Sequence, residues 1–120
     1  MKSYEIRLVD GVVETTMLGP AKCSDVKASM SEVAKQNSKL RLWDLSAGVD
    51  FSAKEAQQIG DYGKEVFKDH PNSYLAVVAP SDLAFGTIRM ESFYREDGKV
   101  VQRVFRSKTE ALEWLESREI

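Results

Sequence analysis

The stretch that decides the fold is residues 40–56, LRLWDLSAGVDFSAKEA. Its first part, Leu40 to Leu45, is mostly apolar and has the length of a strand. After a short loop, the run from Ser52 to Glu55 matches the capping box, in which serine and glutamate side chains bond free backbone N–H groups at a helix start. The stretch therefore predicts a strand that runs into an amphipathic helix, whose N-terminus would attract anions.

The residues before this stretch predict a hairpin followed by a helix. Apolar and polar side chains alternate in residues 4–8, Asp10-Gly11 is a two-residue turn signal, and residues 12–17 return as a second strand. Gly19-Pro20 is expected to open the helix, because proline is tolerated in a first turn. One face of this helix carries Val26, Met30, Val33 and Ala34.

The residues after the stretch predict two more strand and helix pairs. Tyr74 to Ala79 is continuously apolar, which indicates a central strand covered on both faces. Ser81 is expected to cap the helix that follows. Val100 to Phe105 is the last strand, and a second capping box, Ser107 to Glu110, opens the final helix.

The predicted order of elements is therefore β-β-α-β-α-β-α-β-α. Alternating strands and helices imply right-handed crossovers and a sheet that is partly parallel. No linker, repeat or low-complexity tract interrupts the chain. We expect an α/β fold with a mixed sheet, in one domain that spans residues 1–120.

Composition narrows the classes of partner and compartment. The chain has 120 residues, and its 17 basic and 19 acidic residues nearly balance, so no long-range field steers it to nucleic acid or to an anionic membrane. Its longest apolar run, Leu75 to Pro80, is far too short for stable membrane insertion. The lone Cys23 fits a reducing compartment, and the charged N-terminal residues lack the apolar core of a signal peptide. We expect a cytoplasmic protein without a nucleic-acid partner.

Four short segments carry a resemblance to a known family. Residues 43–52, WDLSAGVDFS, resemble the strand and loop of STAS domains, the fold of bacterial anti-sigma-factor antagonists. Residues 85–90, 104–107 and 110–115 (FGTIRM, VFRS and EALEWL) are similar to the SpoIIAA-like branch, a group of small bacterial proteins. The resemblance implies a STAS (SpoIIAA-like) fold and a regulatory partner protein. It also implies a small apolar or acyl ligand as an alternative, because STAS-type folds have been compared with lipid-binding folds.

The resemblance makes Ser52 the position to examine for phosphorylation. Antagonist STAS domains place an Asp-Ser or Ser-Ser pair and a glycine at this helix start, and a serine there is phosphorylated. Here the residues are Phe51-Ser52-Ala53-Lys54, without the pair or the glycine. Ser52 either caps the helix or holds a phosphate, and its match with Glu55 favours the cap.

The first candidate site is the joint between the strand and the helix. It would present a partner or ligand surface, at the carboxyl end of a strand where ligands bind in open α/β sheets. Its residues are Asp44, Ser46, Asp50, Phe51 and Ser52. Asp44 and Asp50 fit turn and cap roles, and the alternative is a carboxylate pair for acid–base work.

The second candidate site is the helix from Leu83 to Tyr94. Leu83, Thr87, Met90 and Tyr94 define one face, and neighbouring apolar residues widen it. Such an arc predicts packing on two sides, a two-fold homodimer contact, or the wall of an apolar ligand pocket. The residues chosen for the pocket or dimer face are Phe85, Arg89, Met90 and Tyr94, and the arginine would hold an anionic headgroup.

Three functions follow, in order of preference. The first is a non-enzymatic regulatory or protein-interaction module, and the second is a carrier of a small apolar ligand. The third, an enzyme that uses Asp44 or Asp50, is disfavoured because nucleophile, base and oxyanion donors should appear together. We predict no catalytic residue, no metal and no cofactor, and we expect the lone His70 and Cys23 to be structural.

Overall fold

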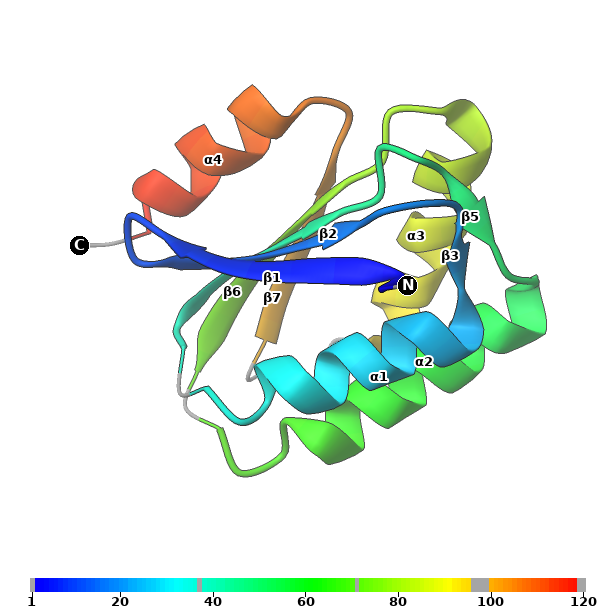
Figure 1. Ribbon diagram of the computed structural model, residues 1–120, viewed down its shortest axis with the longest axis horizontal. Helices are drawn as coiled ribbons and strands as arrows, with labels where there is room; N and C mark the ends of the chain where they lie inside the picture. Colours follow the sequence, from blue (N-terminus) through cyan, green and yellow to red (C-terminus); the bar gives the residue numbers. More distant parts are fainter. Residues whose placement is uncertain (1, 37, 71, 96–99, 119–120) are drawn as a thin grey trace.

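A five-stranded mixed sheet is the framework of the computed structural model, which describes residues 2–36, 38–70, 72–95 and 100–118 (Figure 1). The strands stand in the order β1-β2-β4-β6-β7; β1 and β2 are antiparallel, and the other neighbours are parallel. Their bounds are β1 (Tyr4–Val9), β2 (Val12–Met17), β4 (Leu40–Asp44), β6 (Ser73–Val78) and β7 (Val100–Phe105). The predicted α/β class with a mixed sheet is confirmed.

Helices cover both faces of this sheet (Figure 1). One face carries α1 (Cys23–Val33), α2 (Ala53–Val66) and α3 (Asp82–Arg95), and the other carries α4 (Lys108–Glu116). None of the helices in the described part of the chain has the length and apolar character needed to cross a membrane.

Two hydrophobic clusters result, one on each side of the sheet. Val26, Ile59 and Ile88 belong to the larger cluster beneath α1, α2 and α3, and Leu42 and Leu115 belong to the cluster beneath α4. All five residues of β4 are buried, as are five of the six in β6. The central strand expected at residues 74–79 is therefore covered on both faces, as predicted.

Two short strands are absent from the prediction. β3 (Ala21–Lys22) and β5 (Val49–Asp50) form a parallel pair beside the main sheet. Because β3 is extended, the expectation that Gly19-Pro20 opens the first helix is wrong, and α1 begins at Cys23. The backbone groups of residues 21 and 22 bond to β5 instead of forming a first helical turn. Ala21 is completely buried.

The buried face of α3 also differs from the prediction. Leu83 and Met90 are 73% and 44% exposed, whereas Ala84, Ile88 and Glu91 are buried. Small Ala84 allows a close approach, and the Glu91 carboxylate accepts a hydrogen bond of 2.6 Å from the Gln102 side-chain amide on β7. A polar residue thus holds a core position because a partner on the sheet bonds to it. Thr87 is half-buried, and the predicted contribution of the Tyr94 side chain lies outside the described residues.

We expect Leu115→Ala to lower the free energy of unfolding by about 2–5 kcal/mol, because it opens a cavity beneath α4, where Leu115 is fully buried. Urea denaturation followed by circular dichroism measures the loss. The matched control is Leu83→Ala on the exposed side of α3, which should change stability by no more than about 0.5 kcal/mol. Equal losses in the two variants would contradict the assignment of α4 to the core.

Candidate functional site

The carboxyl ends of the parallel strands gather the loops that precede the helices. β2, β4, β6 and β7 all end at this edge of the sheet, because they run in the same direction. The loops that follow them lead into α1, α2, α3 and α4 respectively. The joint between β4 and α2, residues 45–52, lies between the loops after β2 and β6, at the kind of edge where open α/β sheets bind ligands.

Asp44 holds the turn at the start of this joint. It is the last residue of β4 and only 8% exposed, and its Oδ1 accepts hydrogen bonds from the backbone N–H of Ser46, at 2.9 Å, and from the Ser46 hydroxyl. The Leu45 N–H donates to the carbonyl of Val78 on β6, at 2.8 Å. The carboxylate therefore has the turn role that an aspartate favours.

The middle of the joint is tied to the chain that precedes α1. Gly48 has φ +98°, a conformation that side chains with a Cβ rarely adopt. Its carbonyl accepts a hydrogen bond of 3.0 Å from the Ala21 N–H, and β5 pairs with β3 immediately afterwards. The loop is thus held by backbone pairing as well as by the Asp44 turn.

The end of the joint is the predicted capping box. The Glu55 N–H donates to Ser52 Oγ at 3.2 Å, and the Ser52 N–H donates to Glu55 Oε1 at 2.9 Å. At α4 only half of the second predicted box forms, because the Ser107 hydroxyl, rather than the Ser107 N–H, donates to Glu110 Oε1, at 3.1 Å. Ser52 is therefore engaged as a helix cap.

The remaining residues of the joint differ in exposure. Ser46, Asp50 and Ser52 are exposed, whereas Phe51 is half-buried against the larger hydrophobic cluster. Within the described ranges, no hydrogen bond joins Asp44 to Asp50, and no group of three or more His, Cys, Asp or Glu side chains has the arrangement of a metal site. The joint presents polar side chains from a fixed backbone, with one aromatic ring as an anchor.

The second candidate site becomes a groove between α3 and β7. Phe85 and Arg89 line it from the helix, and Gln102, Arg103 and Val104 line it from the strand, around a volume of about 300 Å³. Met90 is not among the lining residues, and the side chain of Tyr94 is outside the described residues. The structure therefore brings Phe85 and Arg89 together and leaves Met90 outside the groove.

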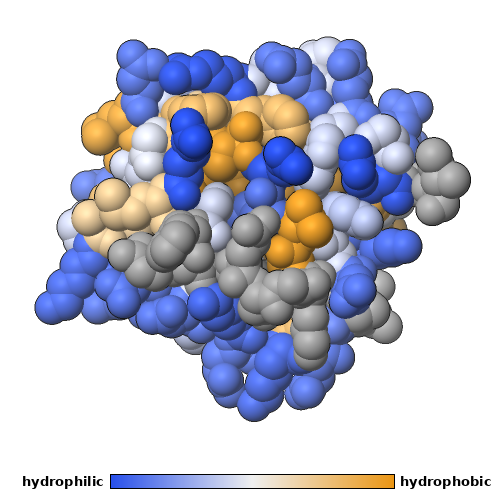
Figure 2. Space-filling model, turned by 180° about the vertical axis from the view of Figure 1, so that it is seen from behind, coloured by the Kyte–Doolittle hydropathy of each residue, from blue (hydrophilic) through white to orange (hydrophobic). Residues whose placement is uncertain are grey.

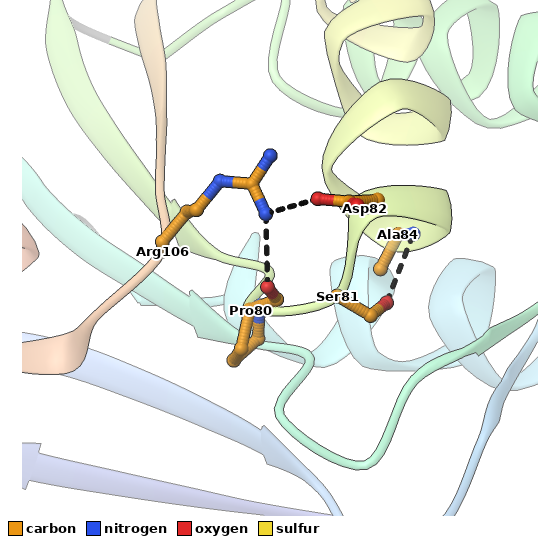
Figure 3. Close-up of polar contacts among 5 residues, drawn as sticks. All are labelled: Pro80, Ser81, Asp82, Ala84 and Arg106. Atoms are coloured by element: carbon orange, nitrogen blue, oxygen red, sulfur yellow. Dashed lines mark hydrogen bonds and ion pairs between the residues drawn. The ribbon is translucent and has the colours of Figure 1, made fainter.

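Arg106 is part of this region, and the sequence analysis missed it. Its guanidinium lies 4.4 Å from the centre of the Phe85 ring. As Figure 3 shows, it also donates to the carbonyl of Pro80, at 3.2 Å, and to the Asp82 carboxylate, at 2.6 Å, beside the Ser81 cap of α3. Its place immediately after β7, opposite the start of α3 across a parallel strand pair, is the signal that could have identified it.

An apolar cavity lies elsewhere, between the sheet and helices α1 and α2. Its volume is about 40 Å³, and its lining includes Met30, Trp43 and Phe67. That volume holds about three water molecules, at roughly 10–15 Å³ each, and is too small for an acyl chain. The buried Trp43 Nε1 has no acceptor among the described residues, so a water molecule is the fitting occupant. The cavity therefore gives no support to the apolar-ligand alternative.

Comparison with known proteins assigns no family to the chain. Neither a protein-family model nor a curated protein sequence matches it. The STAS-type resemblance consequently stays a prediction.

Ser52→Ala should cost about 1 kcal/mol of stability, because the Glu55 N–H at the start of α2 loses its acceptor, Ser52 Oγ. Thermal or urea unfolding measures the change. Ser52→Asp should retain most of the stability, since aspartate is also a good N-cap. Ser24→Ala, at an exposed position in the first turn of α1, is the control and should stay within about 0.5 kcal/mol of wild type. An unchanged Ser52→Ala variant would contradict the capping role.

The Cys23 thiol should react slowly at neutral pH. Burial raises its pKa above the ordinary value, and the Glu55 carboxylate acts in the same direction against the opposing effect of Lys27. Because the thiolate is the nucleophile, the folded protein holds less of the reactive form at a given pH than the unfolded chain does. Cys23 is the sole cysteine, so the rate of alkylation by iodoacetamide reports this group alone.

The pH–rate profile of Cys23 alkylation should have a higher midpoint in native protein than in urea. By linkage, the native state binds this proton more tightly, so Cys23 contributes stability at neutral pH that declines as pH rises through the raised pKa. A native midpoint at or below the midpoint in urea would identify an activated cysteine instead.

Proposed function

We propose that this protein is a cytoplasmic, non-enzymatic interaction module that binds a regulatory partner protein through the joint between β4 and α2. The observation that carries the proposal is the conformation of the joint: an exposed polar loop whose backbone is held at three points. These are the Asp44 turn, the pairing of β3 with β5 and the Ser52 capping box. A loop fixed before binding loses little conformational freedom when a partner docks, which favours affinity.

Exposed apolar side chains flank this loop. Leu18, in the loop after β2, is 56% exposed, and Leu83, in the first turn of α3, is 73% exposed. Both lie at the same edge of the sheet as the joint, because they follow strands on either side of β4. Apolar side chains beside a polar loop supply the kind of contact area that protein interfaces use.

The resemblance to STAS domains agrees with this proposal. Residues 43–52, which form this joint, carry the resemblance, and the resemblance implies a regulatory partner protein. The box formed by Ser52 and Glu55 supports a cap without phosphate, so the partner would recognise the unmodified loop. The free thiol of Cys23 supports the cytoplasmic assignment.

Asp50→Arg tests the surface directly, because the Asp50 side chain is exposed while its backbone alone pairs with β3. Immobilised wild type and variant would be exposed to extract of the source organism, and captured proteins identified by mass spectrometry. We expect at least one partner to be retained by wild type and depleted at least tenfold by the variant.

Asp61→Arg is the matched control, with the same change of charge at an exposed position further along α2. It should retain the partner, and all three proteins should have the same melting temperature. Identical sets of captured proteins on wild type and Asp50→Arg would refute the proposed surface.

A further inference from the structure

The groove between α3 and β7 combines a free strand edge with positive charge. β7 is the last strand in the sheet order, and no strand within the described ranges pairs with its outer side. The Phe105 carbonyl accepts from the Ala79 N–H on the chain that follows β6, at 2.8 Å. Because backbone groups alternate along a strand, the N–H and C=O groups of Gln102 and Val104 point away from β6, toward the outer side.

The side chains of these two residues also line the groove. Gln102 is 6% exposed, its side-chain amide donates to Glu91 and to Ser92, and its Oε1 accepts no hydrogen bond from the described residues. The floor of the groove therefore offers a buried acceptor, and the rim offers backbone groups suited to an added strand.

Positive charge surrounds the same groove. Arg89 and Arg103 line it and are exposed, and neither forms an ion pair with a described residue. Arg89 and Arg106 both approach the ring of Phe85, with guanidinium carbons 6.0 and 4.4 Å from its centre. Among the described residues, Arg106 alone of these three arginines has an acidic partner, the highly exposed Asp82. Positive charge is therefore concentrated at this groove, although the net charge of the whole chain is −2.

Apolar surface lies beside these arginines. Figure 2 shows the face at the β7 edge, where apolar atoms are interrupted by strongly hydrophilic side chains. Val101 on β7 is 37% exposed, and Met90 on α3 is 44% exposed. An occupant of the groove would therefore meet free backbone groups and arginines, and exposed apolar surface at Val101 and Met90 lies outside the groove lining.

We propose that an acidic, extended peptide segment of a partner protein binds this groove by adding a strand to the outer edge of β7. The strand pairing would use the outward backbone groups of Gln102 and Val104. Carboxylates of the peptide would pair with Arg89 and Arg103, which match carboxylate geometry through their planar forks. This surface is separate from the joint and does not depend on the proposed function of the joint.

Fluorescence anisotropy with a labelled octapeptide of alternating glutamate and valine tests the proposal on the intact protein. We expect saturable binding that weakens as salt is raised, since exposed charge pairs are screened. A lysine–valine octapeptide should not bind. A glutamate–valine peptide methylated on alternate backbone nitrogens should bind at least tenfold more weakly, because it lacks donors for the edge of β7.

Charge reversals locate the site. Arg89→Glu and Arg103→Glu should each weaken binding about tenfold or more, which corresponds to one charge-assisted contact. The matched control, Arg7→Glu on β1 at the opposite edge of the sheet, should change affinity less than twofold. Asp50→Arg should also leave peptide affinity unchanged, because Asp50 lies on the joint and not in the groove. The two proposals can therefore fail independently.

Three results would overturn the proposal. The first is the absence of saturable binding to the acidic peptide. The arginines would then serve only to protect the edge of β7 against aggregation. The second is equal binding of the methylated peptide, and the third is tighter binding of a single-stranded oligonucleotide than of the acidic peptide. Circular dichroism of each variant checks that the fold is intact.

Discussion

Burial of β4 on both faces is the constraint on which the rest of the structure depends. Leu42 faces the cluster under α4, Trp43 faces the cluster under the other helices, and the strand has β2 and β6 on its two sides. A strand enclosed in this way must have its polar residues satisfied locally. Arg41, near one end, donates to Ser73 Oγ at 2.6 Å and lies over the ring of Phe67, and Asp44, at the other end, binds Ser46.

The joint follows from that constraint. Since the chain leaves β4 at the carboxyl edge, it must turn sharply before α2 can pack under the sheet. The Asp44 carboxylate and the positive φ of Gly48 make this turn, and the pairing of β3 with β5 holds it against the chain before α1. The same contacts that close the fold therefore also hold an exposed loop in one conformation.

The arrangement of α3 shows how a helix and an edge strand share polar contacts. Glu91 is fully buried and bonds Gln102, which places an ionisable side chain and an amide where apolar residues usually pack. Leu83, in the first turn of the same helix, is exposed. Beside it, the guanidinium of Arg106 connects the end of β7 to the start of α3 through Pro80 and Asp82.

The sequence by itself determined the α/β class, the main strands and the serine caps, because these depend on local patterns: alternation, apolar runs and the spacing from Ser52 to Glu55. Asp44, Ser46, Asp50 and Phe51 lie on one joint because they are close together in the chain. Only the tertiary structure decided the buried face of α3, the late start of α1 and the place of Arg106. Each depends on a partner distant in sequence: Gln102 for Glu91, β5 for β3, and Pro80 and Asp82 for Arg106. Local sequence patterns do not identify partners that are distant in the chain. These hydrogen bonds therefore follow only from the assembled sheet.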